Sequence, residues 1–147
     1  MADRILIING PNINMLGTRE KQIYGNQSLE EINKEIANMP ILKDIDLEFF
    51  QSNHEGVIID KIQEALGRVK VIIINAGALT HYSIAIHDAL KAVDIPVIEV
   101  HLSNIYAREG FRDRSLISPI AAGGVFGFGA TGYKMAVYGA CELLKDN

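Results

Sequence analysis

Apolar runs recur along the chain between segments of mixed character. Residues 5–8 and 71–74 are wholly apolar, which is typical of strands buried on both faces of a parallel sheet. Residues 45–51 alternate apolar and polar side chains before two aromatics, as expected of a strand nearer a sheet edge. A further strand is predicted at 96–100, with proline at its first position, and a short edge strand at 120–122.

Segments with helical periodicity lie between these strands. Ser28 and Glu31 have the S-x-x-E spacing of a capping box and open a helix predicted to run to residue 37, before Pro40. Ser52 and Glu55 repeat that spacing and form a second possible capping box. The same periodicity predicts further helices at 57–66, 83–93 and 131–144.

Alternating strands and helices predict an α/β fold with right-handed crossovers. Five strands in one small unit favour a flavodoxin-like, doubly wound parallel sheet in the order 2-1-3-4-5, with helices on both faces. No repeat or linker interrupts the sequence, so residues 1–147 are predicted to form a single domain. Ligands of such sheets bind beyond the carboxyl ends of the strands, here the loops that open at Asn9, Asn75 and His101.

Composition narrows the class of protein. A hydrophobic fraction of 48% is ordinary for a globular domain, and no apolar run is long enough to span a bilayer. The formal net charge of -4 argues against a nucleic-acid partner. Cys141 is the only cysteine, which excludes an intramolecular disulfide and a cysteine-rich metal site. With no signal-peptide pattern before the first strand, we expect a cytoplasmic protein.

The loop after the first strand is long for a strand-to-helix connection, and long loops of this kind are often lids or binding loops. It carries Asn12, Asn14, Arg19 and Tyr24, which can order a polar ligand. Further arginines gather in a second loop, at 108, 112 and 114. In an acidic protein this suggests a local anion site, although solvated surface arginines are the alternative. We hypothesise that the first loop closes over a small anionic substrate.

Two positions could carry proton chemistry. Strand alternation puts Glu99 and His101 on the same side of the strand. There the carboxylate would hold the tautomer of the imidazole and favour its protonated form, so that His101 could act as a general acid. The alternative is that Glu99 serves an unrelated salt bridge. A free phenol titrates near 10, so Tyr24 could act as a base only if nearby arginines favoured the phenolate; otherwise it simply packs in the loop. His81 also follows a buried strand and is a further candidate.

Two other motifs are weaker. Residues 127–132 match G-x-G-x-x-G, but no strand or acidic residue follows at the distance that a dinucleotide site requires, so a close-packed turn into the last helix is the better interpretation. His81 and His87 have a spacing loosely like that of zinc ligands, but no cysteine or carboxylate cluster completes a metal site. His54 and His87 are interpreted as packed or surface histidines.

Several motifs together identify a family. The chain contains, in order, N-G-P-N-I-N-M-L-G-T-R-E at 9–20 with Y-G at 24–25, Q-S-N at 51–53, N-A-G-A-L-T-H at 75–81, and E-V-H-L-S-N at 99–104 with R-E at 108–109 and F-R at 111–112. It resembles type II 3-dehydroquinate dehydratase over essentially its whole length. The resemblance implies a hydro-lyase of the shikimate pathway to chorismate and the aromatic amino acids. Such an enzyme converts 3-dehydroquinate to 3-dehydroshikimate by anti elimination through an enolate, without metal, cofactor or Schiff base.

The resemblance also implies roles for the residues in these motifs. Tyr24 would take the proton from C2, Arg19 and Arg108 would favour its phenolate, and Asn12 would hold a water that stabilises the enolate oxygen. His101, oriented by Glu99, would protonate the departing C1 hydroxyl.

Substrate binding and assembly are likewise implied by the resemblance. Asp88 would reach the site of a neighbouring subunit within a trimer, and trimers would form a homododecamer. The substrate would be held by Asn75, His81 and Arg112, and by the backbone N–H groups of Leu102 and Ser103.

Two other functions compete. A flavodoxin-like FMN-binding module would carry a short Ser/Thr/Gly-rich phosphate turn after the first strand, where this chain has a long loop with amides and an arginine. A receiver domain would need acidic residues after the first and third strands, where Asn9 and Asn75 stand.

Overall fold

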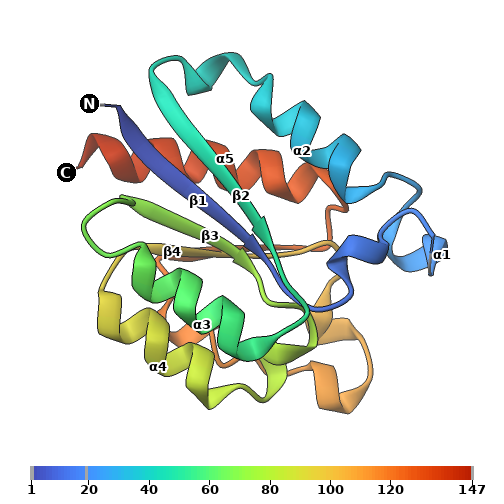
Figure 1. Ribbon diagram of the computed structural model, residues 1–147. Coiled ribbons are helices and arrows are strands. Elements are labelled where there is room, and N and C mark those ends of the chain that lie inside the picture. The colour runs from blue at the N-terminus through green and yellow to red at the C-terminus, as the bar shows by residue number, and fades with distance from the viewer. Residues whose placement is uncertain (1, 19, 147) are drawn as a thin grey trace.

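A five-stranded parallel sheet organises the structure, a computed structural model that describes residues 2–18 and 20–146 (Figure 1). Its strands are β1 (Asp3–Asn9), β2 (Ile45–Gln51), β3 (Val71–Asn75), β4 (Val97–His101) and β5 (Gly123–Phe126). They lie in the order β2-β1-β3-β4-β5, and all neighbouring pairs are parallel. The predicted flavodoxin-like order 2-1-3-4-5 is therefore confirmed, as is the edge position of residues 45–51.

Helices cover both faces of the sheet (Figure 1). Helices α2 (Leu29–Ala37) and α5 (Thr131–Lys145) lie on one face, and α3 (Glu55–Glu64) and α4 (Ile84–Val93) on the other. The one-turn helix α1 (Lys21–Tyr24) lies beyond the end of the sheet, in the loop after β1. Shorter 3-10 helices shape the loops: η1 (Ile13–Met15), η2 (Pro40–Leu42), η3 (Gly77–His81), η4 (Ile105–Ala107), η5 (Gly110–Arg112) and η6 (Ser118–Ile120).

The apolar runs in the sequence are explained by burial on both faces. In β1, Ile5 and Ile7 join the hydrophobic cluster under α2 and α5, whereas Leu6 and Ile8 join the cluster under α3 and α4. Residues 71–74 of β3 divide between the two clusters in the same way, and all eight side chains have no exposed surface. Each such burial is worth about 1.5–3 kcal/mol, so these two strands are the centre of the core.

The two predicted capping boxes had different outcomes. At α2, Glu31 N donates to Ser28 Oγ at 3.1 Å and Ser28 N donates to Glu31 Oε1 at 3.5 Å, which confirms the first. The second is wrong, because His54 rather than Ser52 precedes α3, and Ser52 Oγ accepts from His54 N. Helix α3 runs from Glu55 to Glu64 and covers most of the helical segment predicted at 57–66.

The predicted strand at 120–122 is also wrong. Pro119 favours a helical turn and lacks an N–H, and η6 occupies residues 118–120. The edge strand β5 begins only at Gly123. At β4 the strand includes His101, so this residue is held by the sheet rather than by the following loop.

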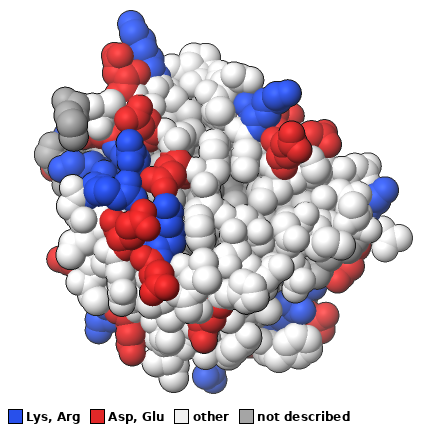
Figure 2. Space-filling view, in the orientation of Figure 1, with Lys and Arg blue, Asp and Glu red and all other residues white. Residues whose placement is uncertain are grey.

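An ion-pair network covers the outer edge of the sheet, at β2. Glu48 accepts from Lys61 and lies 3.8 Å from Arg4 and 3.4 Å from Arg68. Figure 2 shows basic and acidic side chains interspersed on this face, with no broad field of one sign. Charged side chains on an edge strand hinder pairing with another chain. Among the described residues, no helix has the length and apolar character needed to cross a bilayer.

Candidate active site

A cavity of about 80 Å³ lies at the carboxyl ends of β1, β3 and β4. This is the edge of the sheet at which the fold predicts a ligand site. The first loop, the loop after β3 and the loop after β4 all contribute to its wall. The wall includes these sequence-predicted residues: Asn12, Tyr24, Asn75, His81, His101, Leu102, Ser103, Arg108 and Arg112.

Glu99 and His101 form a buried pair on β4. His101 Nε2 lies 2.8 Å from Glu99 Oε2, and the two side chains are 6% and 0% exposed. Strand alternation brings them together, as the sequence predicts. Because Nε2 faces Glu99, the other ring nitrogen, Nδ1, is the one that can exchange a proton with a ligand.

Glu99 has two further partners that the sequence did not suggest. Ser115 Oγ donates to Glu99 Oε2 at 2.5 Å, and Ser118 Oγ donates a short hydrogen bond to Oε1. Burial raises the pKa of the Glu99 carboxyl, but the hydrogen bonds from His101, Ser115 and Ser118 outweigh it, so the pKa is lowered. Ser115 lies in the loop before η6 and Ser118 is the first residue of η6, and no sequence pattern distinguishes them from other serines.

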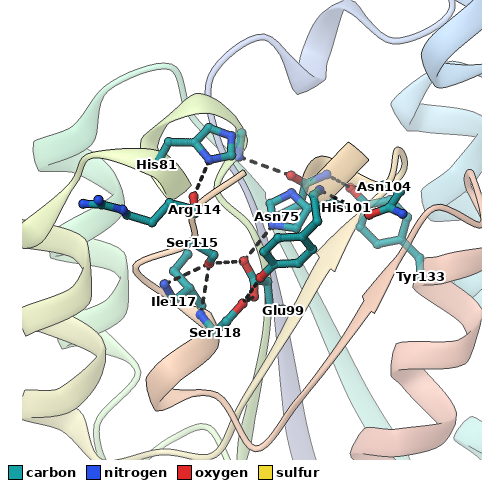
Figure 3. A network of polar contacts seen from close by, with 12 residues as sticks. Asn75, His81, Glu99, His101, Asn104, Arg114, Ser115, Ile117, Ser118 and Tyr133 are labelled. Carbon is teal, nitrogen blue, oxygen red and sulfur yellow. Dashed lines mark hydrogen bonds and ion pairs between the residues drawn. The ribbon is translucent and has the colours of Figure 1, made fainter. Parts of the chain in front are cut away.

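His81 ends η3 and is held by one ring nitrogen. Its Nδ1 lies 2.7 Å from the backbone oxygen of Arg114, so Nδ1 carries the hydrogen (Figure 3). Burial lowers the pKa of His81, and the charges of His101 and Arg112 lower it further. The ring is therefore neutral at pH 7, and Nε2 can accept a hydrogen bond from a ligand hydroxyl.

Asn75, the last residue of β3, is anchored from two sides. Its Nδ2 donates to Tyr133 Oη at 3.0 Å (Figure 3), and Gly77 N donates to its Oδ1 at 3.2 Å. Tyr133 in turn donates to Asn9 Oδ1 at 2.5 Å. The second N–H of Asn75 is the one that remains for a ligand. Sequence reasoning missed Tyr133, because it lies 58 residues away on α5.

Tyr24 and Arg108 contact each other in the wall of the cavity. Arg108 Nη1 donates to Tyr24 Oη at 2.8 Å and to Ser103 Oγ at 3.3 Å. Its guanidinium also lies 5.5 Å from the centre of the tyrosine ring. A cation at this distance stabilises negative charge on the phenolic oxygen. Arg19, the other arginine predicted here, lies outside the described residues.

The other predicted residues differ in their relation to the cavity. Asn12 reaches it from a left-handed backbone conformation, with φ at 70°, and its N–H donates to Asn53 Oδ1. Arg112 is held by Glu109, 3.1 Å from Nε.

Asn14 does not line the cavity, and its Oδ1 accepts instead from Gln51 at 3.4 Å. Asp88 is exposed on α4 and does not line it either.

The weaker motifs have structural explanations. In the G-x-G-x-x-G segment, Gly127 and Gly129 have positive φ, and Gly129 N donates to Leu102 O at 2.9 Å. The predicted turn into the last helix is therefore confirmed. His87 packs with Nδ1 2.6 Å from Leu116 O. The described part of the chain contains no group of three or more His, Cys, Asp or Glu side chains placed to hold a metal ion.

Comparisons with known proteins agree on one family. A family model described as "Dehydroquinase class II" matches residues 3–141. A 3-dehydroquinate dehydratase of Caldicellulosiruptor bescii is 56% identical over 96% of this chain and 98% of its own. One of Nitratiruptor sp. is 52% identical over 97% of this chain and 92% of its own.

Solved structures agree with the sequence comparisons. A type II dehydroquinase from Butyrivibrio crossotus superposes with a TM-score of 0.91 and is 50% identical, over 95% of this chain and 97% of that one. A type II dehydroquinase from Propionibacterium acnes has a TM-score of 0.90 at 37% identity, over 97% and 98%. The FMN-binding alternative is not supported by these findings.

Proposed function

Since the chain belongs to the class II dehydroquinase family and is a 3-dehydroquinate dehydratase, we propose that Tyr24 and His101 are the two proton-transfer groups of its site. The reaction removes water from 3-dehydroquinate to give 3-dehydroshikimate, a hydro-lyase step of the shikimate pathway. The observation that carries the proposal is that a tyrosine paired with an arginine and a histidine paired with a glutamate line the same small cavity.

Tyr24 is proposed as the base. A tyrosine can take up the C2 proton next to the ketone only through an anionic phenolic oxygen, and the Arg108 guanidinium, 2.8 Å away, is placed to stabilise that anion. Removing that proton leaves an enolate. Asn12, whose side chain lines the cavity, would hold a water against the enolate oxygen. Arg19 is assigned to the same base through the family motif.

His101 is proposed as the acid that protonates the leaving C1 hydroxyl. Its Nε2 is bound to Glu99, so Nδ1 is the atom that donates. Glu99 fixes this orientation and balances the charge of the imidazolium. An acid and a base on separate walls of one cavity suit an anti elimination, in which the two groups leave from opposite faces of the ring.

The other cavity residues are proposed to position the substrate. Neutral His81 accepts a hydrogen bond from a ring hydroxyl at Nε2, and Asn75 donates one from Nδ2. Arg112 contributes positive charge for the anionic substrate. The backbone N–H groups of Leu102 and Ser103, directly after β4, would bind the carboxylate.

The test is an assay of purified protein with 3-dehydroquinate and no added cofactor, followed by the ultraviolet absorbance of the conjugated product. We expect turnover that survives EDTA and that is not lost on borohydride treatment with substrate. Tyr24→Phe should lower kcat by at least about a thousandfold and leave Kd for substrate nearly unchanged. A Tyr24→Phe enzyme with near-normal kcat would exclude this base.

A homododecamer built as a tetramer of trimers is also proposed, with Asp88 entering a neighbouring site. Asp88 lies one helical turn beyond Ile84 on α4, and Ile84 and Tyr82 are 66% and 65% exposed. Apolar side chains so exposed favour coverage by a second copy.

Subunit mixing tests this assembly. If Asp88→Asn and Tyr24→Phe are each nearly inactive, a mixture refolded together should regain activity, because some sites then contain both wild-type residues. No recovery in mixed oligomers, or a monomer by light scattering, would contradict the proposal.

The single-domain organisation of residues 1–147 and the cytoplasmic location remain proposals. The first is supported by two hydrophobic clusters on opposite faces of one sheet. The second is supported by the lone Cys141, which is buried and whose thiol pKa is raised by burial, so it stays reduced and protonated in a reducing compartment.

A further inference from the structure

The Glu99 carboxylate is bound by a chain of hydroxyl groups that begins at Ser115 and Ser118 (Figure 3), and no residue of this chain lines the substrate cavity. Ser115 and Ser118 both bind the Glu99 carboxylate, and Tyr106 Oη lies 2.8 Å from Ser118 Oγ. Every oxygen of Glu99 is thus occupied, two partners on Oε2 and one on Oε1.

The direction of each hydrogen bond in this chain is fixed. A carboxylate can only accept, so both serine hydroxyls donate to Glu99. Ser115 Oγ accepts in turn from the backbone N–H groups of Ile117 and Ser118, at 3.1 and 3.0 Å. Because the hydrogen of Ser118 points to Glu99, its oxygen must accept from Tyr106. All donors therefore point toward Glu99, which is the arrangement that favours an anion.

Ser118 and Tyr106 also face a second cavity. This cavity, of about 230 Å³, has Glu99, Tyr106, Ser118 and Phe126 in its wall, and it lies behind the pair rather than on the substrate side. A buried carboxylate without partners would take up a proton. A protonated Glu99 could no longer balance an imidazolium at His101, and a neutral imidazole is a much weaker acid.

We propose that Ser118, supported by Tyr106 and acting with Ser115, is a positioning residue that keeps Glu99 anionic and thereby keeps His101 oriented as the proton donor of the reaction. This inference rests on the proposed role of His101. According to this inference, three hydroxyl groups outside the substrate cavity, those of Tyr106, Ser115 and Ser118, contribute to the proton transfer. Their effect should appear in kcat and in its pH dependence rather than in KM.

The sharpest test compares Ser118→Val with Ser118→Thr. The two side chains have nearly the same shape, but only threonine keeps the hydroxyl, and the extra methyl of both limits entry of a water from the second cavity. The other ionisable side chains that share the cavity with His101 or contact its network are the same in both variants: Tyr24, His81, Tyr106, Arg108 and Arg112.

Relative to Ser118→Thr, we expect Ser118→Val to lower kcat about tenfold and to change KM less than about twofold. On the acidic side of the kcat profile, the inflection that reports Glu99 should move to higher pH by about one unit, because the Glu99 carboxylate has lost a donor. Tyr106→Phe, at an exposed position, should shift this inflection in the same direction by a smaller amount. It provides a second test if Ser118→Val folds poorly.

A matched control is Ser83→Ala. Like Ser118, Ser83 donates its hydroxyl to a carboxylate, Glu55 Oε2 at 2.5 Å, and it also caps α4. Its loss should lower the melting temperature and leave the pH profile as in the wild type. The same outcome for Ser118→Val, a lower melting temperature with an unchanged pH profile, would overturn the proposal. Equal kcat for the Val and Thr variants would also overturn it.

A second readout does not depend on turnover. In substrate-free protein carrying ¹³C-labelled glutamate, the Glu99 carboxyl signal, assigned with Glu99→Gln, should titrate about one pH unit higher in Ser118→Val than in Ser118→Thr. An unchanged midpoint contradicts the inference even if the wild type fails to dehydrate 3-dehydroquinate. That failure would reject the proposed function alone.

Discussion

At the scale of single residues, the orientation of one amide determines what the end of β3 can offer a ligand. Burial raises the pKa of Tyr133 above its ordinary range, so its hydroxyl stays protonated and donates to Asn9. Its oxygen must then accept from Nδ2 of Asn75, and Gly77 N–H occupies Oδ1. The amide of Asn75 is therefore held with its remaining N–H available to the substrate.

Replacing Tyr133 with Phe tests this arrangement. The change leaves Asn9 Oδ1 and Asn75 Nδ2 buried without their shared partner, so we expect unfolding free energy to fall by about 2–3 kcal/mol in urea titrations. The Asn75 amide then keeps only the hydrogen bond from Gly77 N and is less well oriented, so kcat/KM for 3-dehydroquinate should fall about tenfold. Tyr138→Phe, on the exposed side of the same helix, should change neither quantity. Equal behaviour of the two variants would show that Tyr133 does not orient Asn75.

Pairs close in sequence could be assigned from a local pattern, whereas pairs far apart could not. Tyr24 and Arg108, 84 residues apart, were predicted together only through the family motifs. Glu99 and His101 are two positions apart on one strand, so alternation alone places them together. Ser115 and Ser118 reach Glu99 from 16 and 19 residues away, and Tyr133 reaches Asn9 from 124 residues away. Such pairs depend on how loops and helices pack, which no local pattern encodes.

At the scale of elements, the site depends on a close approach of two loops. A Cβ on Gly10, just after β1, would lie 2.4 Å from the backbone oxygen of Ala76, just after β3. Gly10 N also donates to Asn75 O at 2.8 Å, which ties the two loops together. Only glycine fits there, because the obstructing atoms belong to the backbone and cannot rotate away.

Gly10→Ala should therefore separate the loops that carry Asn12 and Asn75. We expect a loss of about 1–3 kcal/mol in unfolding free energy, as in other overpacked positions, together with a fall in kcat/KM of at least about tenfold. Gly56→Ala is the matched control, since its new Cβ meets no atom within 4 Å and α3 benefits from alanine. It should stabilise the protein by about 0.4–1 kcal/mol with unchanged activity. A stable, active Gly10→Ala protein would contradict the close approach.

Element prediction was accurate where periodicity was strong and failed in short irregular segments. The apolar strands β1 and β3 and the capped helix α2 follow directly from their patterns. The edge strand β5 begins with Gly123 and Gly124, which carry no strand signal. Helix α1 has only four residues and forms within the long first loop, where tertiary contacts rather than propensity decide the conformation.

At the scale of the whole molecule, one carboxylate, Glu99, is buried at the end of the sheet that carries the site, and another, Glu48, forms ion pairs at the β2 edge. Hydrogen bonds from its partners lower the pKa of Glu99 against the opposing effect of burial. At the β2 edge, a hydrogen bond from Lys61 is the main cause of a lowered pKa of Glu48. Both carboxyl groups thus hold a proton less tightly in the folded protein than at their ordinary value of 4.5.

These shifts predict how stability depends on acidity. Between the lowered pKa values and about 4.5, the unfolded chain binds more protons than the folded one, so stability falls as pH falls through this range and is fully present above it. Urea unfolding at about pH 6, pH 4.5 and pH 3.5, at one protein concentration, measures the slope. Glu99→Gln should reduce the slope of unfolding free energy against pH more than Glu48→Gln does. The Glu48 side chain is 25% exposed, so solvent screens its ion pairs, whereas Glu99 has no exposed surface. An identical slope in all three proteins would mean that the acid sensitivity arises from other groups, and that the buried carboxylate at the active site is not held ionised by its neighbours.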